Sequence, residues 1–378
     1  MSSIRRKTLL SIFSIVAILA VMVPWKVTPV LAMASGYMAK TMCSEHFVAG
    51  RTDLDHIRSD VLDIEPMFGW FHHDIDHDKG VASAFLGPGI YSVSAVYRGG
   101  LGCTIAVQVD PSTLAEPESV HGRTRQPLPA VDRTNPELER VLDRAFSEPE
   151  PGSHRQTRAI VVLHEGQVVA ERYAEPFGPD TPLLGWSMTK SITNALVGIL
   201  VKDGVLALDD PAPVPEWREP GDIRGDITLR HLLQMSSGLD FAEEYAPGTD
   251  ATKMLFSEYS AGNYAVKAGL AYPPGTHWSY SSGTSNILAR IVFDHVGASP
   301  QAVYEFMQKR LFQPLGLASM VVESDSSGAP VGSSFSYASA RDWARLGQFW
   351  LQDGVWEGQR ILPEGWMEWS ASPAPAAP

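Results

Sequence analysis

Cysteine is nearly absent from this chain of 378 residues. The two cysteines, Cys43 and Cys103, are too few for a disulfide scaffold, and their spacing fits neither a zinc ribbon nor a CxxC redox site. Positive charge is also scarce, because 30 Lys and Arg residues oppose 43 Asp and Glu residues and leave a net charge of −13. Such a chain repels nucleic acid and anionic lipid surfaces, so we expect no nucleic-acid partner and favour a small molecule or peptide.

The chain has no internal repeat and no disordered or fibrous composition. Hydrophobic residues make up 44% and charged residues 19% of the sequence, which are values typical of globular proteins. The length predicts two domains, or one large domain that carries an insertion.

One long apolar run is present, and it lies at the amino terminus. An Arg-Arg-Lys triplet at residues 5–7 precedes the apolar residues 9–23, a pattern typical of an export signal. An Ala-Met-Ala sequence at residues 32–34 offers a cleavage site. Residues 1–34 are therefore predicted to be either a cleaved signal or a retained membrane anchor, and we expect the protein in the periplasm or cell envelope.

Export bears on the two cysteines, because an exported chain folds under oxidising conditions. Two alternatives remain open from the sequence: Cys43 and Cys103 form one disulfide, or they are two independent buried thiols.

The pattern of strands and polar segments predicts two units. Residues 35–115 form a small unit, in which apolar runs at 89–97 and 104–109 between glycine-rich turns indicate strands. Residues 116–135 are rich in Pro, Arg and Thr without periodicity, which is typical of a linker. Residues 136–378 form the second, larger unit.

The second unit mixes strands and helices. Residues 159–163 and 168–170 flank a short turn and predict an antiparallel β-hairpin. An apolar-periodic segment predicts a helix from about Ser187 to Gly204. Short helices, prolines and glycines alternate over about 210–275, which indicates a mostly helical insertion.

A serine and a lysine lie three positions apart at the start of that helix. Residues three apart share a helix face, so the Lys190 amine can reach the Ser187 hydroxyl. A lysine desolvated by burial can accept the serine proton, and the helix amino terminus favours negative charge that develops on the oxygen. Tyr280 lies 93 positions beyond Ser187, in a serine- and glycine-rich loop ahead of a helix, from which a phenol can relay protons.

Three motifs together resemble the serine hydrolases related to class C β-lactamases and penicillin-binding proteins. They are Ser-Met-Thr-Lys at 187–190, Tyr-Ser-Ser-Gly at 280–283, and the string of residues 227–239. The Tyr280 loop and residues 340–347 most resemble the 6-aminohexanoate-dimer hydrolase and esterase branch. The resemblance covers about residues 135–378 and implies an α+β fold, an α/β/α sandwich with an antiparallel sheet plus a helical insertion.

The resemblance also implies roles for single residues. Ser187 becomes the acylated nucleophile, Lys190 its base, and Tyr280 the proton relay in a hydrolase of a small ester or amide. Tyr245, Ser282 and Trp186 are candidate substrate-binding residues, with simple packing as the alternative for Tyr245 and Trp186. No cofactor and no metal are implied.

Two departures from the family pattern define the alternative hypothesis. The second motif of penicillin-recognising enzymes is Tyr-x-Asn, and Ser282 stands here in place of the asparagine that holds the substrate side chain. A third motif, Lys-Thr-Gly or its variants, is absent downstream of Trp343, so the chain is expected to be a fragment that lacks its last strands. The alternative is a penicillin- or peptidoglycan-recognising protein with slow turnover, or a catalytically inactive relative.

Histidines and acidic residues outside these motifs are given structural interpretations. The Asp-rich residues 74–80 lack the glycine and glutamate positions of a calcium loop, and they are predicted to form a polar turn. His72, His73 and His77 lack further ligands for a closed metal site. His231 is predicted to be a helix residue rather than a catalytic base.

Overall fold

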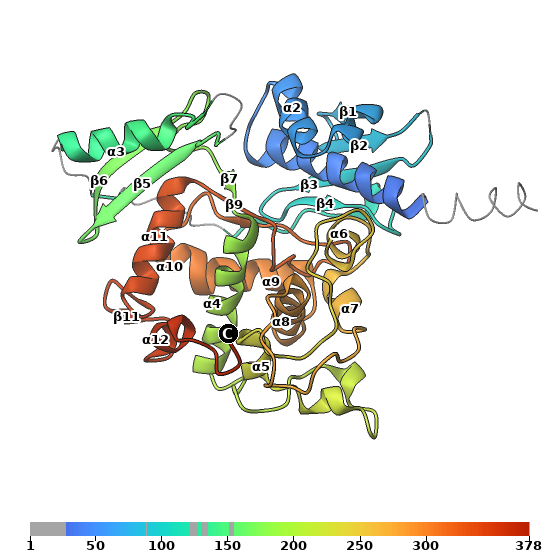
Figure 1. The fold of residues 1–378 in the computed structure, drawn as a ribbon, viewed down its shortest axis with the longest axis vertical. Coiled ribbons are helices and arrows are strands. Elements are labelled where there is room, and N and C mark those ends of the chain that lie inside the picture. Colours follow the sequence, from blue (N-terminus) through green and yellow to red (C-terminus); the bar gives the residue numbers. More distant parts are fainter. Residues whose placement is uncertain (1–27, 88, 121–127, 130–134, 151–154, 378) are drawn as a thin grey trace, which may run out of the picture.

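The computed structural model describes residues 28–87, 89–120, 128–129, 135–150 and 155–377 (Figure 1). Residues 1–27 of the predicted signal or anchor lie outside these ranges, and so does most of the predicted linker. Within the described ranges, no helix combines the length and the apolar character needed to cross a bilayer.

The first part of the fold, residues 28–105, is called the leading module below. It consists of a helix through residues 28–43, its π-helical continuation η1 (Ser44–Val48), α2 (Leu54–Ile64), and the strands β1 (His72–Asp76), β2 (Val81–Phe85), β3 (Val93–Arg98) and β4 (Gly102–Ile105). The strands pair antiparallel in the order β1-β2-β3-β4. The small side chains of Ala82, Ala84 and Ala95 are fully buried, so the first helix packs closely on the sheet.

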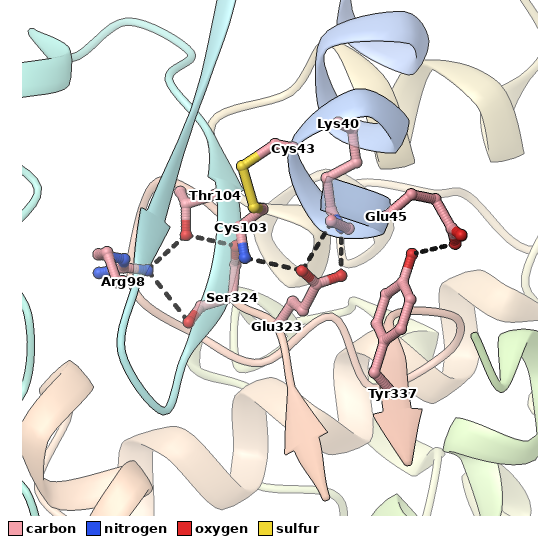
Figure 2. Close-up of a disulfide and its surroundings, with 10 residues drawn as sticks. Lys40, Cys43, Glu45, Arg98, Cys103, Thr104, Glu323, Ser324 and Tyr337 are labelled. Atoms are coloured by element: carbon pink, nitrogen blue, oxygen red, sulfur yellow. Dashed lines mark hydrogen bonds and ion pairs between the residues drawn. A yellow bond between two sulfur atoms is a disulfide. The ribbon is translucent and has the colours of Figure 1, made fainter. Parts of the chain in front are cut away.

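A disulfide joins this helix to the sheet. Cys43 and Cys103 are bonded, with their Cα atoms 6.1 Å apart, so the first of the two alternatives is correct (Figure 2). The spacing of 60 residues could not reveal this pairing, because the fold brings the end of the helix against β4.

Buried polar contacts fix the leading module to the rest of the chain, as Figure 2 shows. The Glu323 carboxylate is fully buried and pairs with the Lys40 ammonium. It also accepts hydrogen bonds from Ser44 Oγ at 2.8 Å and from the Cys103 backbone N–H at 2.7 Å. A side chain at Gly102, whose φ is +62°, would collide with Glu323, so glycine is required there. The two units therefore share one desolvated junction.

Strands of the second unit are short. They are β5 (Ala159–His164), β6 (Gln167–Tyr173), β7 (Leu183–Leu184), β8 (Val321–Val322) and β9 (Ser336–Ala338), with a small hairpin of β10 (Val355–Trp356) and β11 (Gln359–Arg360). The predicted β5–β6 hairpin is confirmed as antiparallel. Strands β7, β9 and β8 form a second antiparallel sheet in that order. Helix α3 (Pro136–Phe146) lies along the β5–β6 hairpin (Figure 1).

Helices make up most of the second unit. They are α4 (Thr189–Lys202), α5 (Leu229–Leu233), α6 (Asp250–Phe256), α7 (Ala261–Ala265), α8 (Ser282–His295), α9 (Pro300–Met307), α10 (Gln313–Leu315), α11 (Ala340–Leu351) and α12 (Trp366–Ala371). Helix α4 runs through the middle of this group and contacts α8 (Figure 1). Because it is apolar on nearly all sides, it is a core helix rather than a surface helix.

The predicted fold class, helices mixed with antiparallel sheet, is confirmed by this arrangement. Residues 210–275 contain only short helices joined by turns, as the alternation of proline and glycine indicates. The described parts of the predicted linker, 116–120, 128–129 and 135, form neither helix nor strand.

Candidate active site

Ser187 lies in a tight turn at the amino-terminal end of α4. The turn is a 3-10 segment, η4 (Trp186–Met188), and α4 begins two residues after Ser187 rather than at it. Trp186 has a left-handed φ of +42°, an uncommon conformation for a large side chain and one often found at functional sites. The exposed Ser187 side chain therefore lies at the end of the helix where partial positive charge favours an oxyanion.

Lys190 contacts Ser187 and is held by two further acceptors. Its Nζ lies 3.3 Å from Ser187 Oγ, 3.1 Å from Ser282 Oγ and 2.9 Å from the Ser333 carbonyl oxygen. The contact of an amine and a hydroxyl one helical turn apart, predicted from the sequence, is present.

Tyr280 completes the trio that the sequence singles out. The Lys190 ammonium lies 4.8 Å from the centre of the Tyr280 ring, within the range of a cation–π contact. Tyr280 precedes α8, and its side chain is 38% exposed. Ser187, Lys190 and Tyr280 therefore meet at one place, although Tyr280 comes from a distant part of the chain.

A carboxylate that the sequence analysis did not assign to the site holds Ser282 and Tyr245 by hydrogen bonds. Glu243 accepts hydrogen bonds from Ser282 Oγ and Ser282 N, both at 2.6 Å, and from Tyr245 OH at 2.8 Å. Burial, together with this carboxylate, raises the pKa of Tyr245 to about 12, so its phenol stays protonated and donates. Tyr245 and Ser282 are thus in the site, with their hydroxyl oxygens 3.3 Å apart.

A pocket of about 410 Å³ opens beside Ser187. Its walls are Met33, Ala34, Tyr37, Ile64, Glu65, Met67, Phe68, Trp186, Ser187, Tyr245, Pro247, Thr252 and Phe256. Trp186 is 40% exposed and also borders a larger hollow of about 900 Å³ that reaches β5 and α11. Trp186 therefore borders both spaces, as Tyr37 and Ile64 also do.

Sequence comparison agrees with the motifs at this site. Residues 142–377, more than half of the chain, match the profile of the family described as Beta-lactamase. The chain belongs to the beta-lactamase family. Its leading module lies outside the matched residues.

Relatives of this beta-lactamase-family protein include named hydrolases. It is 27% identical over 274 residues to the 6-aminohexanoate-dimer hydrolase of Paenarthrobacter ureafaciens, covering 68% of this chain and 64% of that protein. It is 28% identical over 170 residues to a D-aminopeptidase of Brucella anthropi, covering 42% of this chain and 31% of that protein. The chain thus spans less than two thirds of the length of these relatives.

A solved structure has a similar fold. It is a Bacillus anthracis protein described as a candidate 6-aminohexanoate-dimer hydrolase, with a TM-score of 0.53 and 22% identity. The similarity covers 67% of this chain and 71% of that chain. At this identity the comparison supports the fold alone.

Other residues weighed from the sequence are structural. His231 Nδ1 accepts a hydrogen bond from Thr228 N, while Thr228 Oγ1 accepts one from His231 N, so the pair caps α5. His231 is thus the helix residue that was predicted. Residues 74–80 span the β1–β2 hairpin, and Lys79 pairs there with Asp76 at an exposed turn. Within the described residues, no cluster of three or more His, Cys, Asp or Glu side chains is arranged to hold a metal ion.

Two groups of this site, the Ser333 carbonyl and the Glu243 carboxylate, were not predicted from the sequence, for different reasons. The Ser333 carbonyl is a backbone group, so no residue type marks it. Glu243 lies two positions before Tyr245, and that spacing alone could have marked it as a partner of a nearby phenol.

Proposed function

We propose that this protein is a serine hydrolase that cleaves a small ester or amide through an acyl-enzyme on Ser187. The observation that carries the proposal is the contact of Lys190 Nζ with Ser187 Oγ at 3.3 Å, beside Tyr280. Membership of the beta-lactamase family and the named hydrolases among the relatives support it.

The surroundings of Lys190 suit a base. To act as a base, Lys190 must first give up one proton, and the neutral amine then has two N–H donors and one lone pair. The Ser333 carbonyl oxygen and Ser282 Oγ accept hydrogen bonds from the two N–H groups of Lys190. Ser282 Oγ can accept because its own hydroxyl group donates to Glu243. The lone pair is then left for the Ser187 hydroxyl proton.

The reaction follows from this geometry. Ser187 Oγ bonds to the substrate carbonyl carbon while its proton passes to Lys190 Nζ, and the carbonyl oxygen becomes an oxyanion near the amino-terminal end of α4. The oxyanion collapses, the bond to the leaving group breaks, and Tyr280 relays the proton from Lys190 to that group. Water then attacks the acyl carbon and gives a proton to Lys190. The bond between the acyl carbon and Ser187 Oγ breaks, and Lys190 returns the proton to Oγ, which releases the acid and restores Ser187.

Ser282 favours a small ester or amide over a penicillin as the substrate. A hydroxyl offers one donor, whereas an asparagine amide offers two donors and a carbonyl acceptor. The Ser282 hydroxyl is moreover already engaged by Glu243 and Lys190. The names of the two relatives, a dimer hydrolase and an aminopeptidase, also favour this choice.

Export to the periplasm or cell envelope is part of the proposal. The Cys43–Cys103 disulfide supports it, since such bonds persist in oxidising compartments. Cell fractionation, followed by amino-terminal sequencing of the mature protein, distinguishes a cleaved signal from a retained membrane anchor.

Labelling with a fluorophosphonate tests the nucleophile in the full-length protein. We expect one adduct on Ser187, none in Ser187→Ala, and normal labelling in Ser279→Ala, which removes another exposed serine near the site. A parallel assay compares p-nitrophenyl butyrate with nitrocefin. Rapid turnover of the ester supports the hydrolase, whereas acylation by nitrocefin without turnover supports the penicillin-recognising alternative.

A further inference from the structure

We propose that the leading module forms one wall of the acyl pocket and selects substrates whose acyl group is apolar and uncharged. This inference rests on the proposed function, and it adds a substrate class and a role for residues that the family match leaves out. Seven of the thirteen lining residues of the 410 Å³ pocket belong to the leading module: Met33, Ala34, Tyr37, Ile64, Glu65, Met67 and Phe68.

An aromatic cluster joins the module to the second unit at the pocket. Tyr37 stacks on Phe68 with ring centres 4.9 Å apart, and it meets the edge of Phe256 on α6 at 5.0 Å. The first helix approaches α6 so closely that a Cβ at Gly36 would lie 2.2 Å from the Phe256 carbonyl oxygen. The wall is thus continuous between the two units.

The pocket offers apolar surface rather than polar partners. Thr252 Oγ1 donates to the Ala246 carbonyl at 2.9 Å, and Tyr245 OH donates to Glu243, so these hydroxyl protons are already engaged. No Lys or Arg occurs among the described lining residues, and the one carboxylate there, Glu65, repels an anion. An uncharged alkyl or aryl chain gains free energy by leaving water here, whereas a carboxylate would be desolvated without a counterion.

The position of Tyr280 shows which half of the substrate occupies the pocket. The leaving group must lie near the phenol that supplies its proton. Ser187 and Trp186 line the pocket, whereas Tyr280 does not. The pocket therefore holds the acyl half, which stays attached to Ser187 after the first step.

The leading module is a rigid wall of the pocket because its first helix is fixed in place. The Cys43–Cys103 disulfide and the buried Lys40–Glu323 pair secure its first helix. A binding wall held in this way keeps its shape without a substrate and loses little entropy when the substrate binds.

A chain-length series of p-nitrophenyl esters tests the proposal, because the leaving group stays constant. In the full-length protein we expect kcat/KM for the hexanoate to exceed that for the acetate by at least about tenfold. Ile64→Asp places a charge on the pocket wall at a residue that is 62% exposed, so we expect the variant to fold. We expect it to lower the hexanoate-to-acetate ratio of kcat/KM by about fivefold or more.

Ile90→Asp is the matched control, since Ile90 is an exposed isoleucine of the same module that does not line the pocket. It should leave the ratio unchanged. Ester hydrolysis that requires Ser187 but shows no chain-length preference, or a preference that Ile64→Asp leaves intact, overturns the inference and leaves the proposed function standing. Hydrolysis that persists in Ser187→Ala overturns both, and so does the absence of any hydrolysis.

Discussion

Lys190 Nζ lies 3.1 Å from Ser282 Oγ, the side chain that stands where the Tyr-x-Asn motif of penicillin-recognising enzymes has asparagine. Ser282 is fully buried, and its hydroxyl donates a hydrogen bond to Glu243 at 2.6 Å. Ser282 thus contacts the amine directly, and Glu243 holds Ser282 in place. We infer that Ser282 positions Lys190 rather than the substrate.

Replacing Ser282 tests this positioning. Ser282→Ala removes one of the two acceptors that orient Lys190, and we expect kcat to fall about tenfold, equivalent to about 1.4 kcal/mol. KM for a small ester should change by less than about twofold, because the substrate does not depend on this hydroxyl. Steady-state kinetics beside the Ser279→Ala control measure both values. A rise in KM at constant kcat would instead mark Ser282 as a substrate contact.

The dependence of kcat/KM on the leaving group tests whether Tyr280 relays a proton. An alkyl ester or an amide needs a proton on its leaving group, whereas p-nitrophenolate departs without one. In Tyr280→Phe we therefore expect kcat/KM to fall by about 100-fold or more for an amide, and much less for the p-nitrophenyl ester of the same acid. Equal losses for both substrates would contradict a proton relay and indicate a positioning role for the ring.

Local patterns in the sequence predicted the parts of the site that depend on local geometry. The helical period is enough to place Lys190 against Ser187, and a short turn is enough to pair β5 with β6. Tyr280 could be placed only through the family resemblance, because 93 positions separate it from Ser187.

Contacts between segments that lie far apart in the sequence could not be predicted from the sequence. Tyr37 meets Phe256 across more than 200 positions, and Lys40 pairs with Glu323, yet no period or spacing links these residues. The two units therefore looked like separate modules in the sequence, whereas the structure joins them at a buried junction and across one pocket.

Removing one charge from the junction between the two units should lower the free energy of unfolding. Lys40 and Glu323 are both buried, and burial lowers the pKa of Lys40 while Glu323 opposes this effect. Lys40→Met leaves the Glu323 carboxylate buried without its cation, so we expect the free energy of unfolding to fall by about 3–5 kcal/mol. Urea denaturation measures this loss. Lys79→Met, which breaks the exposed pair with Asp76, is the control and should leave stability unchanged.

Asp325 makes stability depend on pH. Burial raises its pKa from 3.8 to about 6, although it accepts hydrogen bonds from Ala261 N and from Ser327. The folded state therefore binds this proton more tightly than the unfolded state, so the stabilisation is complete below about pH 3.8 and is lost as the pH rises through 6. One pKa unit corresponds to about 1.4 kcal/mol, so the loss amounts to about 3 kcal/mol.

Asp325→Asn isolates this group from all other titrations. We expect the wild-type protein to gain about 2 kcal/mol relative to the variant when urea unfolding is repeated at pH 4 instead of pH 8. A difference between the two proteins that is independent of pH would show that Asp325 titrates alike in both states.

Trapping the covalent intermediate tests whether Ser187 is the nucleophile that becomes acylated. The full-length protein is mixed with excess p-nitrophenyl hexanoate, quenched in acid within the first turnovers, and digested for peptide mass spectrometry. The proposed acyl-enzyme mechanism predicts a hexanoyl adduct on Ser187 that forms in the wild-type protein, forms far more slowly in Lys190→Met, and is absent from Ser187→Ala. Turnover that persists in Ser187→Ala, or an adduct that accumulates on a different residue, would contradict it.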